Sequence, residues 1–474
     1  NAGGTTEKEI RIDVFQLDVP TISIADADKG FKVLQGSELT ITPIVDSFLE
    51  TSYSWQINGE DISNELTCTL PTIELGEYQV RFATHNEDGD DEVTFKVEVC
   101  SPDQVDFNWT FLQTEYNMSA GRTIRIKPVD VNNALDAVYT WTVDNEQVQS
   151  GENDTYLFTS EQQGEHTVKV EMKNSYILAT QTLKVNVCPP AGTYQRKISA
   201  TSSASMNKVY EYLPAPGQFI NENHNTTTMA EACTYAEERI NQTAYVSLGG
   251  FGGYIIVGFD HSIVNDGDYN IAITGNAFDG SSEPGIVWVM QDENGDGLPN
   301  DTWYELRGSE YGKAETWQDY AVTYHKPTGI QLPTPWTDNH GQSGSIDYLG
   351  AFHRQDYYYP AWVKEKQYTL RGTRLKERNY DQSGNGTYWV NDSYEWGYAD
   401  NFSAIDRLTD DDNYNAGPSD NHFKISHAVT FDGKDANLKY VDFIKVQVGV
   451  NSKSGWLGEI STEVFGIKDF NMLK

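Results

Sequence analysis

The most specific spacing for chemistry in this chain lies in an acidic loop that runs from Asp292 to Asp301. Oxygen-bearing side chains occupy alternate positions at its start, and a glycine at the sixth position allows a sharp turn. Calcium-binding loops wrap one cation in this way. We expect a structural calcium ion here, and the expected ligands are Asp292, Asn294, Asp296, Leu298 and Asp301.

The loop departs from the EF-hand pattern at one place. Trp303 stands at the twelfth position, where an EF-hand has a bidentate glutamate. Asp301 or Glu305 would have to close the shell instead, and no helical pattern flanks the loop. The alternative interpretation is an ordinary acidic turn without a metal.

A second group of functional candidates is the dense set of aromatic residues between about 330 and 400. Weak strand periodicity there indicates loops, and loops on a rigid scaffold are where binding groups collect. Tyrosine and tryptophan among amides suit flat, amphipathic ligands, and a nearby arginine would meet a phosphate. The expected ligand-binding residues are Trp336, Tyr357, Tyr358, Tyr359, Trp362, Arg374, Tyr380, Trp389, Trp396 and Tyr398. The alternative is that these rings fill an unusually tyrosine-rich core.

Signatures of catalysis are missing from the sequence. It contains no Gly-x-Ser-x-Gly, no His-Glu-x-x-His and no phosphate-binding glycine-rich loop followed by lysine. Acidic pairs that could imitate a glycosidase are expected by coincidence among 70 acidic residues. We therefore expect a binding protein and not an enzyme.

The elements that must position these residues begin with an internal repeat. Residues 36–43 recur 85 positions later, and the segments that begin at Gly76 and Phe95 recur 88 positions later. Each copy spans about 90 residues and alternates apolar with polar side chains, which indicates strands with one buried face. Trp55 and Trp141 occupy equivalent positions and are expected in the two cores.

The remainder of the chain has no repeat and favours one larger domain. Its strand-like runs and glycine pairs predict a jelly-roll-like β-sandwich. One short helix is predicted after Thr228, because Thr228 and Glu231 have the spacing of a capping box. The fold class is thus all-β: two tandem immunoglobulin-like sandwiches followed by a larger sandwich. The predicted boundaries are a tether at 1–7, domains at 8–100 and 101–190, and the ligand-binding domain at 191–474.

The repeated order Gly-x-x-x-x-Ile-x-Pro, Trp, Gly-Glu-(Tyr/His)-x-Val and Asn resembles PKD-like domains. The resemblance implies immunoglobulin-like sandwiches that act as spacers in bacterial surface proteins. The C-terminal segments 208–221, 275–278, 283–289 and 449–459 resemble PKD-bearing surface lipoproteins of gut Bacteroidetes, among them the BtuH-type vitamin B12 (cobalamin)-binding proteins.

That resemblance implies a cell-surface protein that captures cobalamin for a TonB-dependent outer-membrane transporter. The protein would be anchored to the outer membrane or secreted. The alternative function is a glycan-binding or adhesive surface protein.

Composition narrows the partners further. Seventy acidic and 34 basic residues give a formal net charge of −36, which disfavours nucleic acid and anionic lipid as partners. No apolar run is long enough to span a membrane, so no transmembrane segment is expected. The four cysteines form no Cys-x-x-Cys pair, and buried free thiols are expected, with one bridge in the first domain as the alternative.

Overall fold

The computed structural model describes residues 17–474 except 25–26, 48, 73, 105–106, 133, 135, 175–176, 223, 225 and 410–417. The predicted tether at 1–7 lies outside the described residues. The chain divides into two compact units, Asn1–Val105 and Asp106–Lys474. The second predicted sandwich and the C-terminal domain therefore belong to the same unit.

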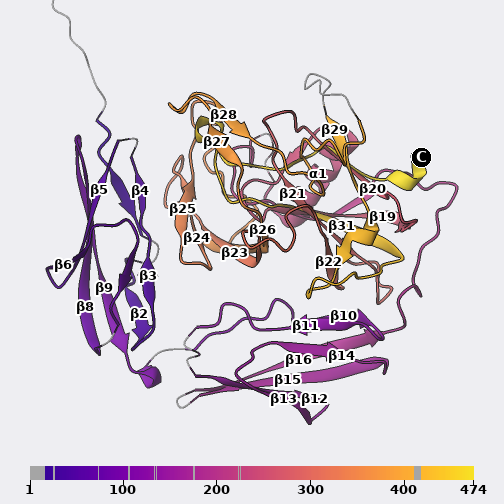
Figure 1. Cartoon of the computed structure of the whole chain (residues 1–474), viewed down its shortest axis with the longest axis horizontal. Coiled ribbons are helices and arrows are strands. Elements are labelled where there is room, and N and C mark those ends of the chain that lie inside the picture. The colour runs from indigo at the N-terminus through magenta and orange to yellow at the C-terminus, as the bar shows by residue number, and fades with distance from the viewer. Residues whose placement is uncertain are drawn as a thin grey trace, which may run out of the picture. The chain divides into compact units, whose positions relative to one another are not determined.

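The first unit is a sandwich built on a five-stranded sheet of order β2-β9-β8-β5-β6, in which β2 runs parallel to β9. Two further pairs, β3-β7 and β1-β4, complete it (Figure 1). Its strands are β1 (Thr21–Ser23), β2 (Phe31–Leu34), β3 (Leu39–Ile41), β4 (Ile44–Asp46), β5 (Ser52–Ile57), β6 (Glu60–Ser63), β7 (Cys68–Leu70), β8 (Gly76–Asn86) and β9 (Gly89–Cys100). A 3-10 turn follows at Pro102–Gln104.

The second sandwich repeats this topology with sheet order β10-β16-β15-β12-β13 and the pair β11-β14. Its strands are β10 (Glu115–Ser119), β11 (Thr123–Ile126), β12 (Val138–Val143), β13 (Glu146–Gly151), β14 (Tyr156–Thr159), β15 (Gly164–Lys173) and β16 (Leu178–Cys188). The sequence repeat therefore maps strand onto strand. Trp55 and Trp141 are fully buried in the two cores, as predicted.

The C-terminal sandwich contains a six-stranded antiparallel sheet of order β17-β19-β31-β21-β22-β30, with sheets β29-β20-β33 and β25-β24-β23-β26 and the pairs β18-β32 and β27-β28. Its first strands are β17 (Lys208–Leu213), β18 (Val246–Ser247), β19 (Tyr254–Val264), β20 (Ile271–Gly275), β21 (Gly285–Met290), β22 (Trp303–Leu306), β23 (Trp317–His325), β24 (Thr334–Asp338) and β25 (Ser343–Ile346). The others are β26 (Gln367–Arg374), β27 (Asn379–Asp381), β28 (Trp389–Asn391), β29 (Ser419–Phe423), β30 (Ala428–Val429), β31 (Tyr440–Val448), β32 (Glu463–Val464) and β33 (Gly466–Asp469). Short 3-10 turns lie at Ile425–His427, Gly455–Leu457 and Phe470–Met472.

The predicted helix is confirmed. Among the described residues it is the one α-helix, α1 (Met229–Asn241), and it packs against β17 (Figure 1). Thr228 accepts a hydrogen bond from the Glu231 backbone N–H, and the Glu231 carboxylate accepts one from the Thr228 N–H, so the capping box is complete. The all-β prediction with one short helix is thus correct.

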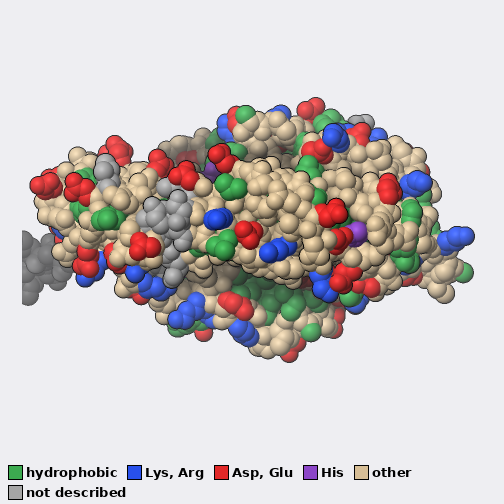
Figure 2. Space-filling model, turned by 90° about the horizontal axis from the view of Figure 1, so that it is seen from below, with side chains coloured by type: hydrophobic (Ala, Val, Ile, Leu, Met, Phe, Trp, Pro, Cys, Tyr) green, Lys and Arg blue, Asp and Glu red, His purple; other side chains and the backbone are tan. Residues whose placement is uncertain are grey.

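The core of the C-terminal sandwich joins the inner face of the six-stranded sheet to α1, β20 and β23. Acidic side chains are spread over the surface with basic ones between them, as one face shows (Figure 2). All four cysteines are free, and Cys68, Cys100 and Cys188 are buried. No helix among the described residues is long and apolar enough to cross a membrane.

Candidate functional site

The outer face of the six-stranded sheet carries an unusual row of side chains. Cross-strand pairing aligns Glu211, Ile256, Lys445, Trp288 and Glu305 on neighbouring strands from β17 to β22. Side chains of directly paired residues project to the same face of a sheet. The row therefore places one cation and one large ring among apolar strands, on the face opposite to the core.

Lys445 is held in this row by aromatic rings. Its ammonium lies 4.7 Å from the centre of the Trp288 ring and 5.3 Å from that of Trp303, within the range of cation–π attraction. Among the described residues no carboxylate lies within 4.0 Å of the Lys445 ammonium. Burial lowers the pKa of Lys445 to about 8, so the group is mainly charged at neutral pH. Its donors remain available to a ligand.

A groove of about 590 Å³ opens over this row. The range for small-molecule sites is about 300–1,000 Å³, and the groove falls within it. The C-terminal sandwich supplies the rings of Trp288, Trp303, Tyr304, Tyr311 and Phe431, together with Lys445 and Arg371. The second sandwich supplies the opposite wall from Leu112 to Val131, including Tyr116, Arg125 and Lys127.

Ion pairs hold the two walls of the groove together. Arg125 forms a bidentate pair with Asp319 at 2.9 and 3.0 Å, and Lys127 reaches the same carboxylate at 2.7 Å. Arg371 pairs with Asp130 on the opposite wall. The second sandwich therefore forms one wall of the groove. A domain that acts only as a spacer, as the sequence resemblance implies, would not line a groove.

The charge of the groove differs from that of the whole protein. Four cationic and four acidic residues line it, against a formal net charge of −36 for the chain. Burial raises the pKa of Asp301 to about 8 and that of Glu305 to about 7. These raised pKa values reduce the negative charge of the groove below what its four acids suggest. The groove thus combines aromatic rings with cationic side chains.

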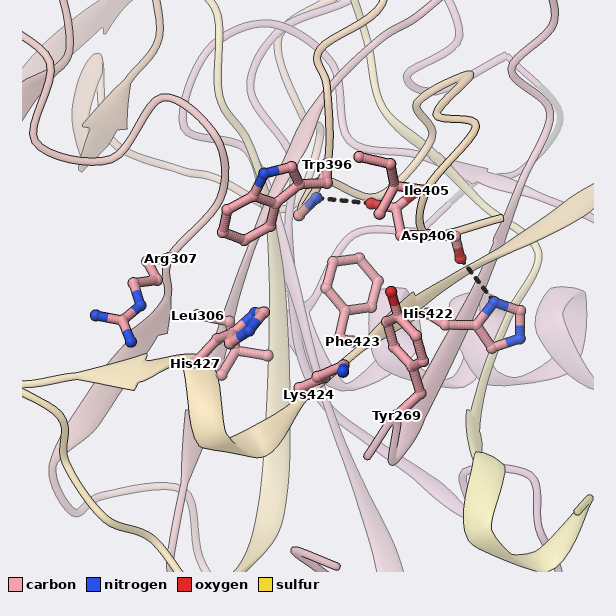
Figure 3. Close-up of a pocket in the computed structure, with 11 residues that line it drawn as sticks. Tyr269, Leu306, Arg307, Trp396, Ile405, Asp406, His422, Phe423, Lys424 and His427 are labelled. Carbon is pink, nitrogen blue, oxygen red and sulfur yellow. Dashed lines mark hydrogen bonds between the residues drawn. The ribbon is translucent and has the colours of Figure 1, made fainter. Parts of the chain in front are cut away.

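A second, smaller cavity of about 240 Å³ lies elsewhere in the C-terminal sandwich. The side chains of Trp396, His427 and Phe423 gather around it, with Arg307 at one side (Figure 3). Burial, followed by the charges of Arg307 and Lys424, lowers the pKa of His427. The His422 ring donates from Nδ1 to the Asp406 backbone carbonyl at 2.8 Å, which fixes that ring.

The structure does not bring the predicted aromatic site residues together. Trp396 lines the smaller cavity, and none of the ten lines the groove. Tyr358, Tyr359, Trp362 and Tyr398 are buried, and a backbone group bonds the polar atom of each ring. These four rings therefore belong to the core, and we exclude them from the proposed site.

The other predicted residues lie at separate places. Trp336 and Tyr357 are half-buried and pack against the core. Arg374 lies 4.4 Å from the centre of the Trp317 ring and pairs with Glu377. Tyr380 is exposed on β27, and Trp389 is half-buried on β28. None of them lines the cavity that Trp396 lines.

The predicted calcium loop is closed by its own hydrogen bonds. Asp292 is buried and accepts from the N–H groups of Gly295 and Gly297, while Asn294 donates to Asp296. The Asp301 side chain is buried, and one of its oxygens has no hydrogen-bond partner. Leu298 is exposed. Among the described residues, no three acids of this loop have carboxylate oxygens that all lie within 4.8 Å of one another.

Sequence reasoning missed the groove because its residues come from distant segments. A lysine and a tryptophan inside otherwise apolar strands, at Lys445 and Trp288, were the available signal. Their adjacency depends on the pairing of β21 with β31, two strands separated by about 150 residues.

Comparisons with known proteins bear on the N-terminal sandwiches. A PKD-like domain matches residues 19–86 and 111–174. Among solved structures, the fibronectin(III)-like modules of Clostridium thermocellum CbhA are 15% identical, with 38% of this chain and all of that chain covered and a TM-score of 0.20. The titin domains Z1Z2 in complex with telethonin are 20% identical over 38% of this chain and all of that chain, with a TM-score of 0.17.

The N-terminal Ig1-2 module of the Drosophila receptor protein tyrosine phosphatase DLAR is 12% identical, with 35% of this chain and 97% of that chain covered and a TM-score of 0.18. No curated protein matches the chain. A PKD-like domain thus matches segments of both N-terminal sandwiches, which confirms the PKD-like resemblance predicted from the sequence.

Proposed function

We propose that this chain is a non-catalytic cell-surface protein that captures cobalamin in the groove over Lys445. In this role it would stand at the outer membrane, as a lipoprotein or a secreted protein, and deliver its ligand to a TonB-dependent transporter. The observation that carries the proposal is an ammonium held by aromatic rings, with no described carboxylate within 4.0 Å, on the floor of a groove of suitable size.

The chemistry of the groove suits this ligand. Cobalamin has a flat, largely apolar corrin ring, amide arms and a phosphate in its nucleotide loop. Trp288 and Trp303 offer rings for apolar contact, and Lys445 and Arg371 offer donors for phosphate and amide oxygens. The walls also hold polar groups such as Gln318 and Asn339. The ligand is larger than the groove, so the groove would hold one side of it.

Titration calorimetry with cyanocobalamin tests the proposal. Trp303→Ala and Lys445→Met should each weaken binding, by about tenfold or more, because each removes a central contact worth about 1–3 kcal/mol. Trp456→Ala is the matched control, since Trp456 is 49% exposed and does not line the groove. Tyr380→Ala changes the aromatic segment predicted from sequence. Binding in the groove should be unchanged in this variant, because Tyr380 does not line the groove. Absence of heat and of any melting shift with the wild-type protein would refute cobalamin capture.

The smaller cavity favours a second candidate function, glycan binding. Trp396 and Tyr269 provide apolar walls, and Arg307, Lys424 and His427 provide polar groups around a space below the drug-sized range. A single sugar unit has this balance of an apolar face and hydroxyl groups. A glycan array with the full chain, compared with Trp396→Ala, would detect this activity.

We also propose a structural calcium ion in the loop Asp292–Asp301, where the unpartnered Asp301 oxygen would close the shell. Chelator should then lower the melting temperature of the protein, and Asp296→Asn should reduce that difference. An equal melting temperature with and without chelator would count against the ion.

A further inference from the structure

A second group of carboxylates, separate from the groove and the acidic loop, lies at the edge of the C-terminal core. Glu283, Asp400 and Glu463 each present an oxygen, and the three oxygens lie within 4.8 Å of one another. We refer to these three residues as the carboxylate cluster. Glu463 and Asp400 are 4% and 1% exposed, and Glu283 is half-buried.

The cluster has hydrogen-bond donors but no cation. Asp400 accepts from the backbone N–H groups of Asn276, Ala277 and Glu463 at 2.8–2.9 Å, and Glu283 accepts from Ser461 N–H at 3.3 Å. Among the described residues, no lysine, arginine or histidine lies within 4.0 Å of any of the three carboxylates. Neutral donors orient the carboxylates, and no basic side chain pairs with them.

Two buried oxygens at this place have no partner. The Oε1 atom of Glu463 makes no hydrogen bond, although the side chain is almost fully buried. Glu459 is 4% exposed and is close enough to Glu283 for their charges to repel, and its Oε2 atom also has no partner. A buried polar atom without a partner is costly, and a bound cation at this place would remove that cost.

The cluster joins segments that are remote in sequence. Glu283 precedes β21, Asp400 follows the turn that pairs Ala399 with Gly285, and Glu463 lies in β32 opposite Ser247. One bound ion would therefore connect three parts of the sandwich.

We propose that Glu283, Asp400 and Glu463 form a binding site for a divalent cation, and that the cation is calcium. A +2 ion would compensate the carboxylates and supply the partner that Glu463 Oε1 lacks. Calcium accepts six to eight oxygen ligands in irregular geometry, whereas magnesium requires a near-octahedral shell. Three carboxylates from independent segments suit the more permissive ion. Glu283 is the least buried of the three ligands.

The site predicts a measurable binding event in the full-length protein. After treatment with chelator and its removal, calorimetric titration with calcium chloride near neutral pH should show binding together with a rise in melting temperature. Glu463→Gln and Asp400→Asn should each remove one ion per chain or weaken that site by about 10- to 100-fold. Both changes are isosteric and remove a buried charge, so circular dichroism in chelator should show folded proteins.

Asp296→Asn is the matched control, because Asp296 belongs to the acidic loop and not to the cluster. Any ion lost in Asp296→Asn reports on the loop alone, and the cluster site should remain. The proposal is overturned if both cluster variants keep the stoichiometry and affinity of the wild type. It is equally overturned if the wild type binds no calcium, in which case the carboxylates share protons.

Discussion

The contact between the second sandwich and the C-terminal sandwich includes one arginine beside a buried carboxylate, and replacing this arginine gives the most demanding test of the structure. Arg122 lies 3.2 Å from a carboxylate oxygen of Glu293, whose side chain is 1% exposed. The pair is in ionic contact although its atoms are not aligned for a hydrogen bond. Arg122 also donates to the Ala436 carbonyl and to Gln291.

Arg122→Met keeps much of the side-chain volume and removes the charge. Breaking one partner from a buried pair costs about 3–5 kcal/mol, because an uncompensated buried charge remains. Protonation of Glu293 limits that cost. Burial raises the pKa of Glu293 to about 7, and Arg122 opposes this rise. Without Arg122 the pKa rises further. The loss of stability near pH 5 should therefore reflect only the hydrogen bonds to Ala436 and Gln291, and it should increase toward the full value near pH 9.

Urea unfolding of the full-length protein measures this effect, and urea is preferred over guanidinium because it does not screen charges. The double variant Arg122→Met with Glu293→Gln should regain most of the stability lost at high pH. The reasoning fails if the single variant loses less than about 1 kcal/mol at high pH, or if its loss does not change with pH. It also fails if the double variant is no more stable than the single one.

Further predictions concern the cores, the helix and pH. Trp55 donates from Nε1 to the Glu65 carbonyl at 2.9 Å, whereas the buried Trp141 Nε1 has no partner, so Trp55→Phe should cost about 1 kcal/mol more than Trp141→Phe in calorimetric unfolding. Thr228→Ala should destabilise the protein by about 1 kcal/mol through loss of the helix cap, and Thr228→Ser should not. In chelator, the melting temperature should fall as pH rises from about 4.5 to about 8, because folded Glu459 keeps a proton to a pKa of about 8.

The sign of the pH effect follows from proton binding. Burial raises the pKa of Glu459 from 4.5 to about 8, so the folded state binds more protons than the unfolded state between these values. Stability therefore decreases through this interval and is constant above it. A melting temperature that increases from pH 5 to pH 8 in chelator would contradict the burial of these acids.

Local patterns in the sequence predicted the local structure well. Alternation such as that of Val93–Val99 predicted strand β9, and the Thr228 and Glu231 spacing predicted the start of α1. These signals involve neighbours within a few residues, so backbone geometry alone determines their outcome. The repeat extended the same reasoning to two complete sandwiches.

Burial in the aromatic segment was harder to predict. Tyr358 and Tyr359 are adjacent, and both are 1% exposed, which period-two alternation does not allow for a regular strand. They lie in an irregular segment, where no periodicity tells an inward ring from an outward one. Hydrogen bonds to the His353 and Glu365 carbonyls satisfy their hydroxyl groups inside the core. Tyrosine density therefore predicts the amount of aromatic packing and not its location.

The groove and the carboxylate cluster share a cause that no local pattern reveals. Lys445 meets Trp288, and Glu463 meets Asp400, because distant strands and turns become neighbours in the fold. Composition misleads here as well. The formal charge of −36 counts every acid as ionised, but burial raises the pKa values of Glu293, Asp301 and Glu459 to about 7 or 8. The protein is therefore less negative at neutral pH than its composition states.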